Sequence, residues 1–195
     1  MHHRADKHRA HDMQRHVTAL AAIAAFTLGG LLSAWALLPG KAPRGIAAIH
    51  PSWKEAAWPF PMDQWGRGTA FHCGASDCGR DITLYLRAKV GFCNCAKGMT
   101  DDSELDRVSD FDLIGGTLYP QATGRPITVA WMRGRSRPFA INSGTMLSIG
   151  LHDHCDALVA TAIVPRGQLA DAELQVMEFL GSKTIVAWAE TALGL

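Results

Sequence analysis

The spacing of hydrophobic and polar residues predicts strands in the central part of the chain. From residue 69 to residue 151, apolar and polar side chains alternate over short stretches, as in a β-strand with one buried face. A continuous apolar run then follows a polar turn at residues 152–156, and a further turn is expected at residues 134–137. The expected strands cover residues 69–73, 81–90, 127–131, 138–141, 147–151 and 157–164.

The hydrophobic period becomes helical after residue 167. Apolar residues then recur three or four positions apart, which predicts a helix over residues 169–180 and a second one over residues 183–193. An earlier short helix is expected to begin after Asp101, its N-cap, and to run to about residue 109. Strands first and helices last predict an α+β domain, a small antiparallel sheet with C-terminal helices, preceded by one N-terminal transmembrane or signal helix.

The N-terminal helix is expected over residues 17–38, which carry no charged side chain. At about 1.5 Å per residue, a helix of this length spans the roughly 30 Å hydrocarbon core of a bilayer. Basic residues are more frequent before this segment than directly after it, which favours a cytoplasmic N-terminus and an exported remainder. The alternative is a cleaved signal peptide, for which residues 34–36 offer an A-x-A cleavage pattern.

Four segments follow from this interpretation. Residues 1–16 form a basic, histidine-rich cytoplasmic tail, and residues 17–38 form the transmembrane anchor or signal segment. Residues 39–62 are rich in proline, which precludes a long helix and predicts an extended tether, with Trp53 and Trp58 packed on the domain. Residues 63–195 form the exported α+β domain, and the expected location is the inner membrane with this domain in the periplasm.

The cysteines support the exported location. Because clustered cysteines in an oxidising compartment are usually cross-linked, Cys73, Cys78, Cys93 and Cys95 are the candidates for two disulfides. Cys93 and Cys95 are only two positions apart, so each is expected to reach back to Cys73 or Cys78. Cys155 is then a buried free thiol, or it pairs with one of the four and leaves another free. A four-thiolate metal site and a redox-active Cys93–Cys95 pair are the alternatives.

His152 and His154 form the candidate metal site. In an extended chain two residues two positions apart point to the same side, so both imidazoles would be placed to hold one zinc or copper ion. The sequence names no third ligand, and the default expectation is therefore no cofactor and a solvated turn. The acidic residues between positions 101 and 112 are interpreted as a solvated helix face, and Arg133, Arg135 and Arg137 as a surface hairpin.

The functional prediction is a protein without enzymatic activity. None of the common hydrolase, zinc-protease or phosphate-loop motifs occurs, and the formal net charge of +1 gives no general attraction for nucleic acid. We expect an accessory or interaction subunit of a cell-envelope assembly, with the membrane and an envelope protein as partners. The alternative is a periplasmic metal-handling or thiol-redox protein that uses Cys93 and Cys95, or His152 and His154.

Overall fold

The computed structural model describes residues 51–92 and 94–195, which belong to one compact unit. The predictions for the cytoplasmic tail, the anchor, the first part of the tether and Cys93 lie outside the described residues. Within the described part of the chain, the helices are too short or too polar to traverse a bilayer.

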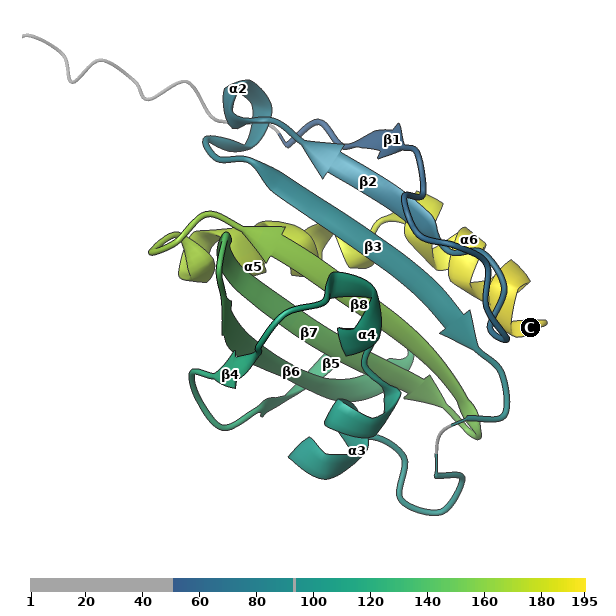
Figure 1. Cartoon of the computed structure of the whole chain (residues 1–195). Helices are drawn as coiled ribbons and strands as arrows, with labels where there is room; N and C mark the ends of the chain where they lie inside the picture. The colour runs from purple at the N-terminus through teal and green to yellow at the C-terminus, as the bar shows by residue number, and fades with distance from the viewer. Residues whose placement is uncertain (1–50, 93) are drawn as a thin grey trace, which may run out of the picture. The chain divides into compact units, whose positions relative to one another are not determined.

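An antiparallel sheet of eight strands forms the centre of the domain (Figure 1). The strands are β1 (Lys54–Ala56), β2 (Thr69–Cys73), β3 (Ile82–Lys89), β4 (Tyr119–Pro120), β5 (Arg125–Val129), β6 (Met132–Ile141), β7 (Gly144–Asp153) and β8 (Asp156–Val164). Their order across the sheet is β1-β2-β3-β8-β7-β6-β4, and β5 also pairs with β6. The chain therefore inserts its last strand, β8, between β3 and β7.

Helices lie on both faces of this sheet. They are α2 (Ala75–Cys78), α3 (Asp102–Val108), α4 (Phe111–Ile114), α5 (Leu169–Leu180) and α6 (Lys183–Leu193). In Figure 1, α5 and α6 lie behind the sheet, whereas α3 and α4 lie in front of it. The predicted α+β class, the antiparallel sheet and the two C-terminal helices are therefore confirmed, and so is the Asp101 cap, whose side chain accepts a hydrogen bond from the Glu104 amide.

The alternation of side chains divides the core between the two faces. Leu158, Ala160 and Ala162 of β8 contribute to the large core under α5 and α6. Ala157 and Val159 of the same strand belong to a smaller core with residues of the α3 segment. The apolar run of β8 thus reflects burial on both of its faces, as expected for a strand with neighbours and helices on either side.

The turn predicted at residues 134–137 is wrong. These residues lie inside β6, and the chain reverses at Ala130 and Trp131, where Ala130 has a φ of 50°. Gly134 serves a different purpose from a turn glycine, because a Cβ atom there would lie 1.8 Å from the carbonyl oxygen of Gly150. The glycine therefore permits close approach of β6 and β7.

The second part of the predicted tether joins the domain. Residues 54–56 form β1 and pair with β2, so this stretch extends the sheet instead of crossing its surface. Trp53 stacks on Phe179 of α5 with the ring centroids 4.5 Å apart, and Trp58 is buried against Tyr85. The packing of both tryptophans on the domain is as expected.

Two disulfides are present, but the predicted pairing is wrong. Cys73 bonds to Cys78, and Cys95 bonds to Cys155. The first bond links the end of β2 to α2 across a short turn, and the second links the loop after β3 to the β7–β8 turn. Cys155 is therefore not a free thiol, and the alternative in which it pairs with one of the other four cysteines is confirmed. The chain has five cysteines, so Cys93 has no further cysteine of this chain with which to pair.

Candidate functional site

The two predicted metal ligands lie in different surroundings. His152 is the penultimate residue of β7, and its ring lies against the backbone of Gly98. His154 follows the strand in a turn, has a φ of 53°, and its side chain is 88% exposed. Because His154 is outside the strand, the same-side geometry of an extended chain does not apply to the pair. Within residues 51–92 and 94–195, no three His, Cys, Asp or Glu side chains converge to hold a metal ion.

His152 nevertheless has an unusual environment. Its Nδ1 atom is buried without a hydrogen-bond partner in the described structure. Burial lowers the pKa of its imidazole, and the positive charge of Arg133 acts in the same direction, against the opposing charge of Asp153. The lowered pKa favours the neutral form of the ring, and its Nδ1 is a buried polar atom without a hydrogen-bond partner among the described residues.

A group of buried charges lies on the α3 side of the sheet and was not predicted from the sequence. Arg87 and Lys89 of β3 are 3% and 4% exposed, and both pair with Asp110, which is 6% exposed. Arg87 also contacts Asp63 with an Nη1–Oδ2 distance of 2.5 Å, and Lys89 donates to the Val108 carbonyl. Burial lowers the pKa of Arg87, but the hydrogen bonds and charges of Asp110 and Asp63 outweigh burial and raise it.

A second set of ion pairs joins β6 to α3. Arg135 Nε donates to Asp102 Oδ1 at 2.9 Å, and Arg137 Nη1 donates to Asp106 Oδ2 at 2.6 Å. Residues two apart in a strand are separated by about 6.6 Å, and residues four apart in a helix by about 6 Å. The two spacings match, so the acidic face of α3 fits the arginine face of β6.

Together these contacts form an ion-pair layer, which consists of Arg87, Lys89, Arg135 and Arg137 with Asp63, Asp102, Asp106 and Asp110. The interpretation as a solvated helix face and a surface hairpin is therefore wrong for the paired residues of this layer, whereas Asp112 and Arg133 are exposed as expected. A signal was present in the sequence, because the acidic residues recur every four positions while the arginines recur every two. The layer neutralises its own charges, which indicates a structural purpose for these residues.

His72 is paired with an acidic side chain. Its Nε2 atom hydrogen-bonds to the carboxylate of Asp81 in an exposed position on β2. The sulfur of Cys155 is disulfide-bonded to Cys95, so Cys155 has no thiolate that could act as a nucleophile. These two residues therefore do not form a nucleophile–base pair.

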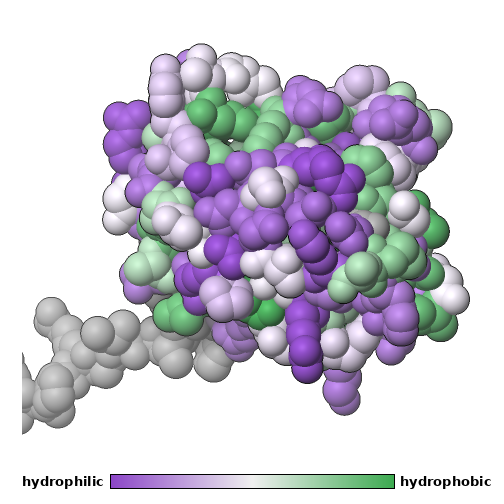
Figure 2. Space-filling model, turned by 90° about the horizontal axis from the view of Figure 1, so that it is seen from below, coloured by the Kyte–Doolittle hydropathy of each residue, from purple (hydrophilic) through white to green (hydrophobic). Residues whose placement is uncertain are grey.

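Small hollows lie in the surface of the domain. Seen from below, the domain is largely hydrophilic, and its hydrophobic residues form separate small patches (Figure 2). One hollow has a volume of about 450 Å³ and lies at the end of β3 near α6. We call it the aromatic hollow; its lining residues are Gln64, Trp65, Gly66, Arg67, Ala88, Val90, Trp188 and Ala192.

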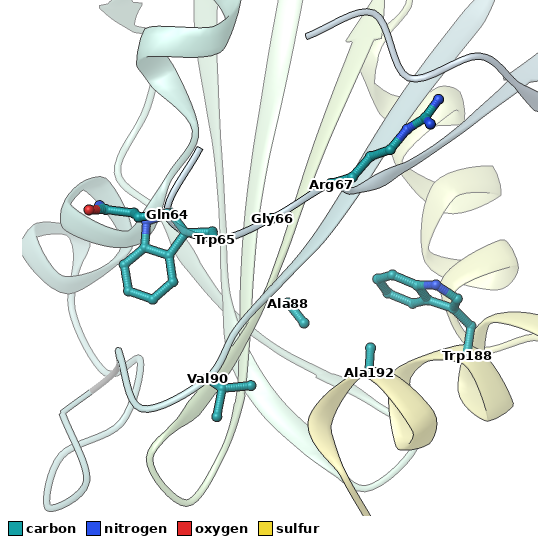
Figure 3. Close-up of a pocket in the computed structure, with 8 residues that line it drawn as sticks. All are labelled: Gln64, Trp65, Gly66, Arg67, Ala88, Val90, Trp188 and Ala192. Atoms are coloured by element: carbon teal, nitrogen blue, oxygen red, sulfur yellow. The ribbon is translucent and has the colours of Figure 1, made fainter. Parts of the chain in front are cut away.

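Three segments far apart in the sequence build the aromatic hollow (Figure 3). The β1–β2 connection brings Trp65 to one side, α6 brings Trp188 to the other, and the small side chains of Ala88 and Ala192 lie between them. Trp65 is held in place by Phe92, with ring centroids 4.4 Å apart. The arrangement provides two large aromatic surfaces and no carboxylate, thiol or imidazole among its lining residues.

Searches against protein-family models, curated proteins and solved structures each find no match to this chain. The structure therefore defines the fold class of the protein: it is an α+β domain with an eight-stranded antiparallel sheet, C-terminal helices and two disulfides. Because such bonds persist in oxidising surroundings, they indicate an extracytoplasmic compartment.

Proposed function

We propose that this chain is a non-enzymatic accessory subunit that binds a protein of the cell envelope through the aromatic hollow. The observation that carries the proposal is the pair of tryptophans, Trp65 and Trp188, on either side of an open hollow. Tryptophan and arginine are enriched at the centres of protein interfaces, and Arg67 lies at the edge of the same hollow. The partner is expected to insert an apolar or aromatic side chain between the two indoles.

The proposal places the domain in the periplasm on a single-span anchor. Its support is the uncharged segment at residues 17–38 and the basic residues that precede it. A tethered domain meets envelope partners at a high effective concentration, so a modest hollow suffices for a stable complex. An anchored accessory subunit therefore requires less contact area than a freely diffusing one.

The test is co-purification of the full chain from detergent-solubilised membranes after mild cross-linking. Val90→Glu introduces a charge into the hollow at a side chain that is 58% exposed, so the fold is expected to tolerate it. Leu174→Glu is the matched control, because Leu174 is 70% exposed on α5 and does not line the hollow. We expect a stoichiometric partner that V90E loses and L174E keeps. Equal recovery with both variants, or no partner with the unchanged chain, would contradict the proposal.

A thiol-redox function is the second candidate, favoured by the exposure of Cys95. Cys73 and Cys78 are fully buried, whereas Cys95 is exposed in its loop, so the Cys95–Cys155 bond is the more accessible to an external thiol. Titration in glutathione buffers separates the candidates. Reversible reduction of this bond near the potential of the glutathione pool supports redox cycling, and resistance to reduction supports a structural bond. The metal-handling version with His152 and His154 stays a prediction.

A further inference from the structure

A second pocket lies where the ends of three strands meet a loop. It has a volume of about 350 Å³ and is separate from the aromatic hollow. In the sheet register Thr128 of β5 lies opposite Arg133 of β6, and Arg133 lies opposite His152 of β7. Directly opposed residues share a face of the sheet, so these three side chains form one row along the pocket.

The loop after β3 completes the pocket with Lys97, Met99 and Thr100. Several contacts hold this loop in place: Asn94 Oδ1 accepts from the Lys97 amide at 3.2 Å, and Arg135 Nη1 donates to the Thr100 carbonyl at 3.0 Å. The Cys95–Cys155 bond ties the same loop to the β7–β8 turn. The pocket is therefore built in advance, which reduces the entropy lost on binding.

Gly98 is required for this arrangement. Its φ is 61°, and a Cβ atom there would lie 2.1 to 2.6 Å from the ring atoms of His152. Only glycine allows the loop to close over the imidazole, so the loop and the histidine form one unit.

The cations of the pocket differ from those of the ion-pair layer. Arg87, Lys89, Arg135 and Arg137 all face carboxylates. No ion pair among the described residues engages Arg133 or Lys97, although Asp101 attracts Lys97 electrostatically. The residues that line the pocket include no carboxylate. Two cations and two threonine hydroxyls therefore line a space that has no carboxylate among its lining residues and that lies beside the ring of His152.

We propose that this cationic pocket, formed by Lys97, Thr100, Thr128, Arg133 and His152, binds a phosphate monoester carried on a small apolar body. A phosphate has enough acceptor oxygens for a guanidinium, an ammonium and hydroxyl donors together. The remaining lining residues, Met99, Pro126 and Ile127, provide an apolar wall for the body of the ligand. Such a ligand is either a soluble phosphate ester or the headgroup of an anionic lipid, since both present the same chemistry.

The test uses calorimetric titration of the full chain in a neutral detergent with butyl phosphate, inorganic phosphate and 1-butanol. We expect butyl phosphate to bind more tightly than inorganic phosphate, and the neutral alcohol to show no binding. Arg133→Gln and Lys97→Gln should each weaken butyl phosphate binding about ten-fold or more, because each removes a charge-assisted hydrogen bond. Lys183→Gln is the control, since it removes the same charge from the start of α6, away from the pocket.

A second arm replaces butyl phosphate by phosphatidic acid in mixed micelles of the same detergent. Binding of phosphatidic acid with the same loss in R133Q and K97Q, without binding of butyl phosphate, supports the site and assigns the lipid as its source. Absence of binding by either phosphate ester, or equal weakening by all three variants, would overturn the proposal. The result is independent of the aromatic hollow, because the two sites share no lining residue.

Discussion

Two groups of cations on one face of the sheet have opposite surroundings. Arg135 and Arg137 of β6 are paired with Asp102 and Asp106, whereas Arg133, on the same face of the same strand, faces an open pocket. The start of α3 explains the difference. The helix begins at Asp102, which pairs with Arg135, so α3 provides no carboxylate one step further along β6, where Arg133 lines the pocket.

The comparison shows that a cation in an alternating strand has two very different uses. Where a helix brings carboxylates at a matching spacing, the cation becomes part of the interior and holds the helix on the sheet. Where the carboxylates end, the same residue type remains available for a ligand. Partner spacing, and not the strand pattern, separates structural from functional cations in this domain.

The largest effect is expected at the centre of the ion-pair layer. Asp110→Asn removes the negative charge shared by Arg87 and Lys89 and leaves two buried cations poorly compensated. The free energy of unfolding should fall by about 3 to 5 kcal/mol, measured by urea denaturation. Asp112→Asn is the matched control, because Asp112 is exposed on α4, and its effect should stay within about 0.5 kcal/mol. Similar values for both variants would show that the layer does not stabilise the fold.

A smaller loss is expected when the loop that carries Lys97 is released. In a Cys93→Ser background, which prevents exchange, replacing Cys95 and Cys155 by serine opens a bond between residues 60 positions apart. The free energy of unfolding should fall by about 2 to 4 kcal/mol, since closing a long loop restricts the unfolded chain strongly. Butyl phosphate binding should weaken in parallel. Unchanged binding would show that the disulfide does not organise the pocket.

The two neighbouring arginines of β6 provide the sharpest comparison. Arg135→Gln removes donors to Asp102 and to the Thr100 carbonyl, and should cost about 2 kcal/mol of unfolding free energy. Arg133→Gln removes no ion pair seen in the described structure and should cost less than about 0.5 kcal/mol. Urea denaturation of both variants checks the difference. An equal loss of unfolding free energy in both variants would contradict the distinction between paired and unpaired cations.

The smallest effect is expected in the pH dependence of stability. Burial raises the pKa of Asp102, but the Gly124 amide and Arg135 outweigh burial and lower it. A carboxyl whose folded-state pKa is lowered stabilises the fold above its ordinary pKa of about 3.9, and this contribution is lost as the pH falls through the lowered value. Asp102→Asn should therefore lose less stability than the unchanged domain between pH 5 and strongly acidic conditions. Urea denaturation at several pH values measures the two slopes, and identical slopes would contradict the assignment.

Local patterns predicted the elements better than they predicted the contacts. The helices at residues 169–180 and 183–193 follow from the hydrophobic period and from Gly181, because such signals act within a few turns of chain. The turn at Ala130 was missed because alanine gives no turn signal in a sequence, although Ala130 adopts a positive φ here. Glycine at position 134 suggested a turn, but the glycine is required by a neighbouring strand that is distant in sequence.

The site required contacts between distant segments. The aromatic hollow depends on Trp65 and Trp188, which are brought together by the packing of α6 on the sheet. The Cys95–Cys155 bond likewise depends on the β7–β8 turn reaching the loop after β3. His152 was singled out as a candidate metal ligand, which stays a prediction, and its neighbours Arg133 and Lys97 in the pocket are cationic. Only the match between acidic and basic spacings in the ion-pair layer was accessible from the sequence alone.

Both the extracytoplasmic location and the fixed loop of the cationic pocket depend on the oxidised state of the cysteines. The decisive measurement is the intact mass of the full chain after alkylation, unfolded without reductant and with a metal chelator present. One alkylated thiol, mapped by peptide analysis to Cys93, is the predicted result, because the other four cysteines form two disulfides. Five alkylated thiols would contradict both disulfides, and with them the extracytoplasmic location and the fixed loop of the cationic pocket.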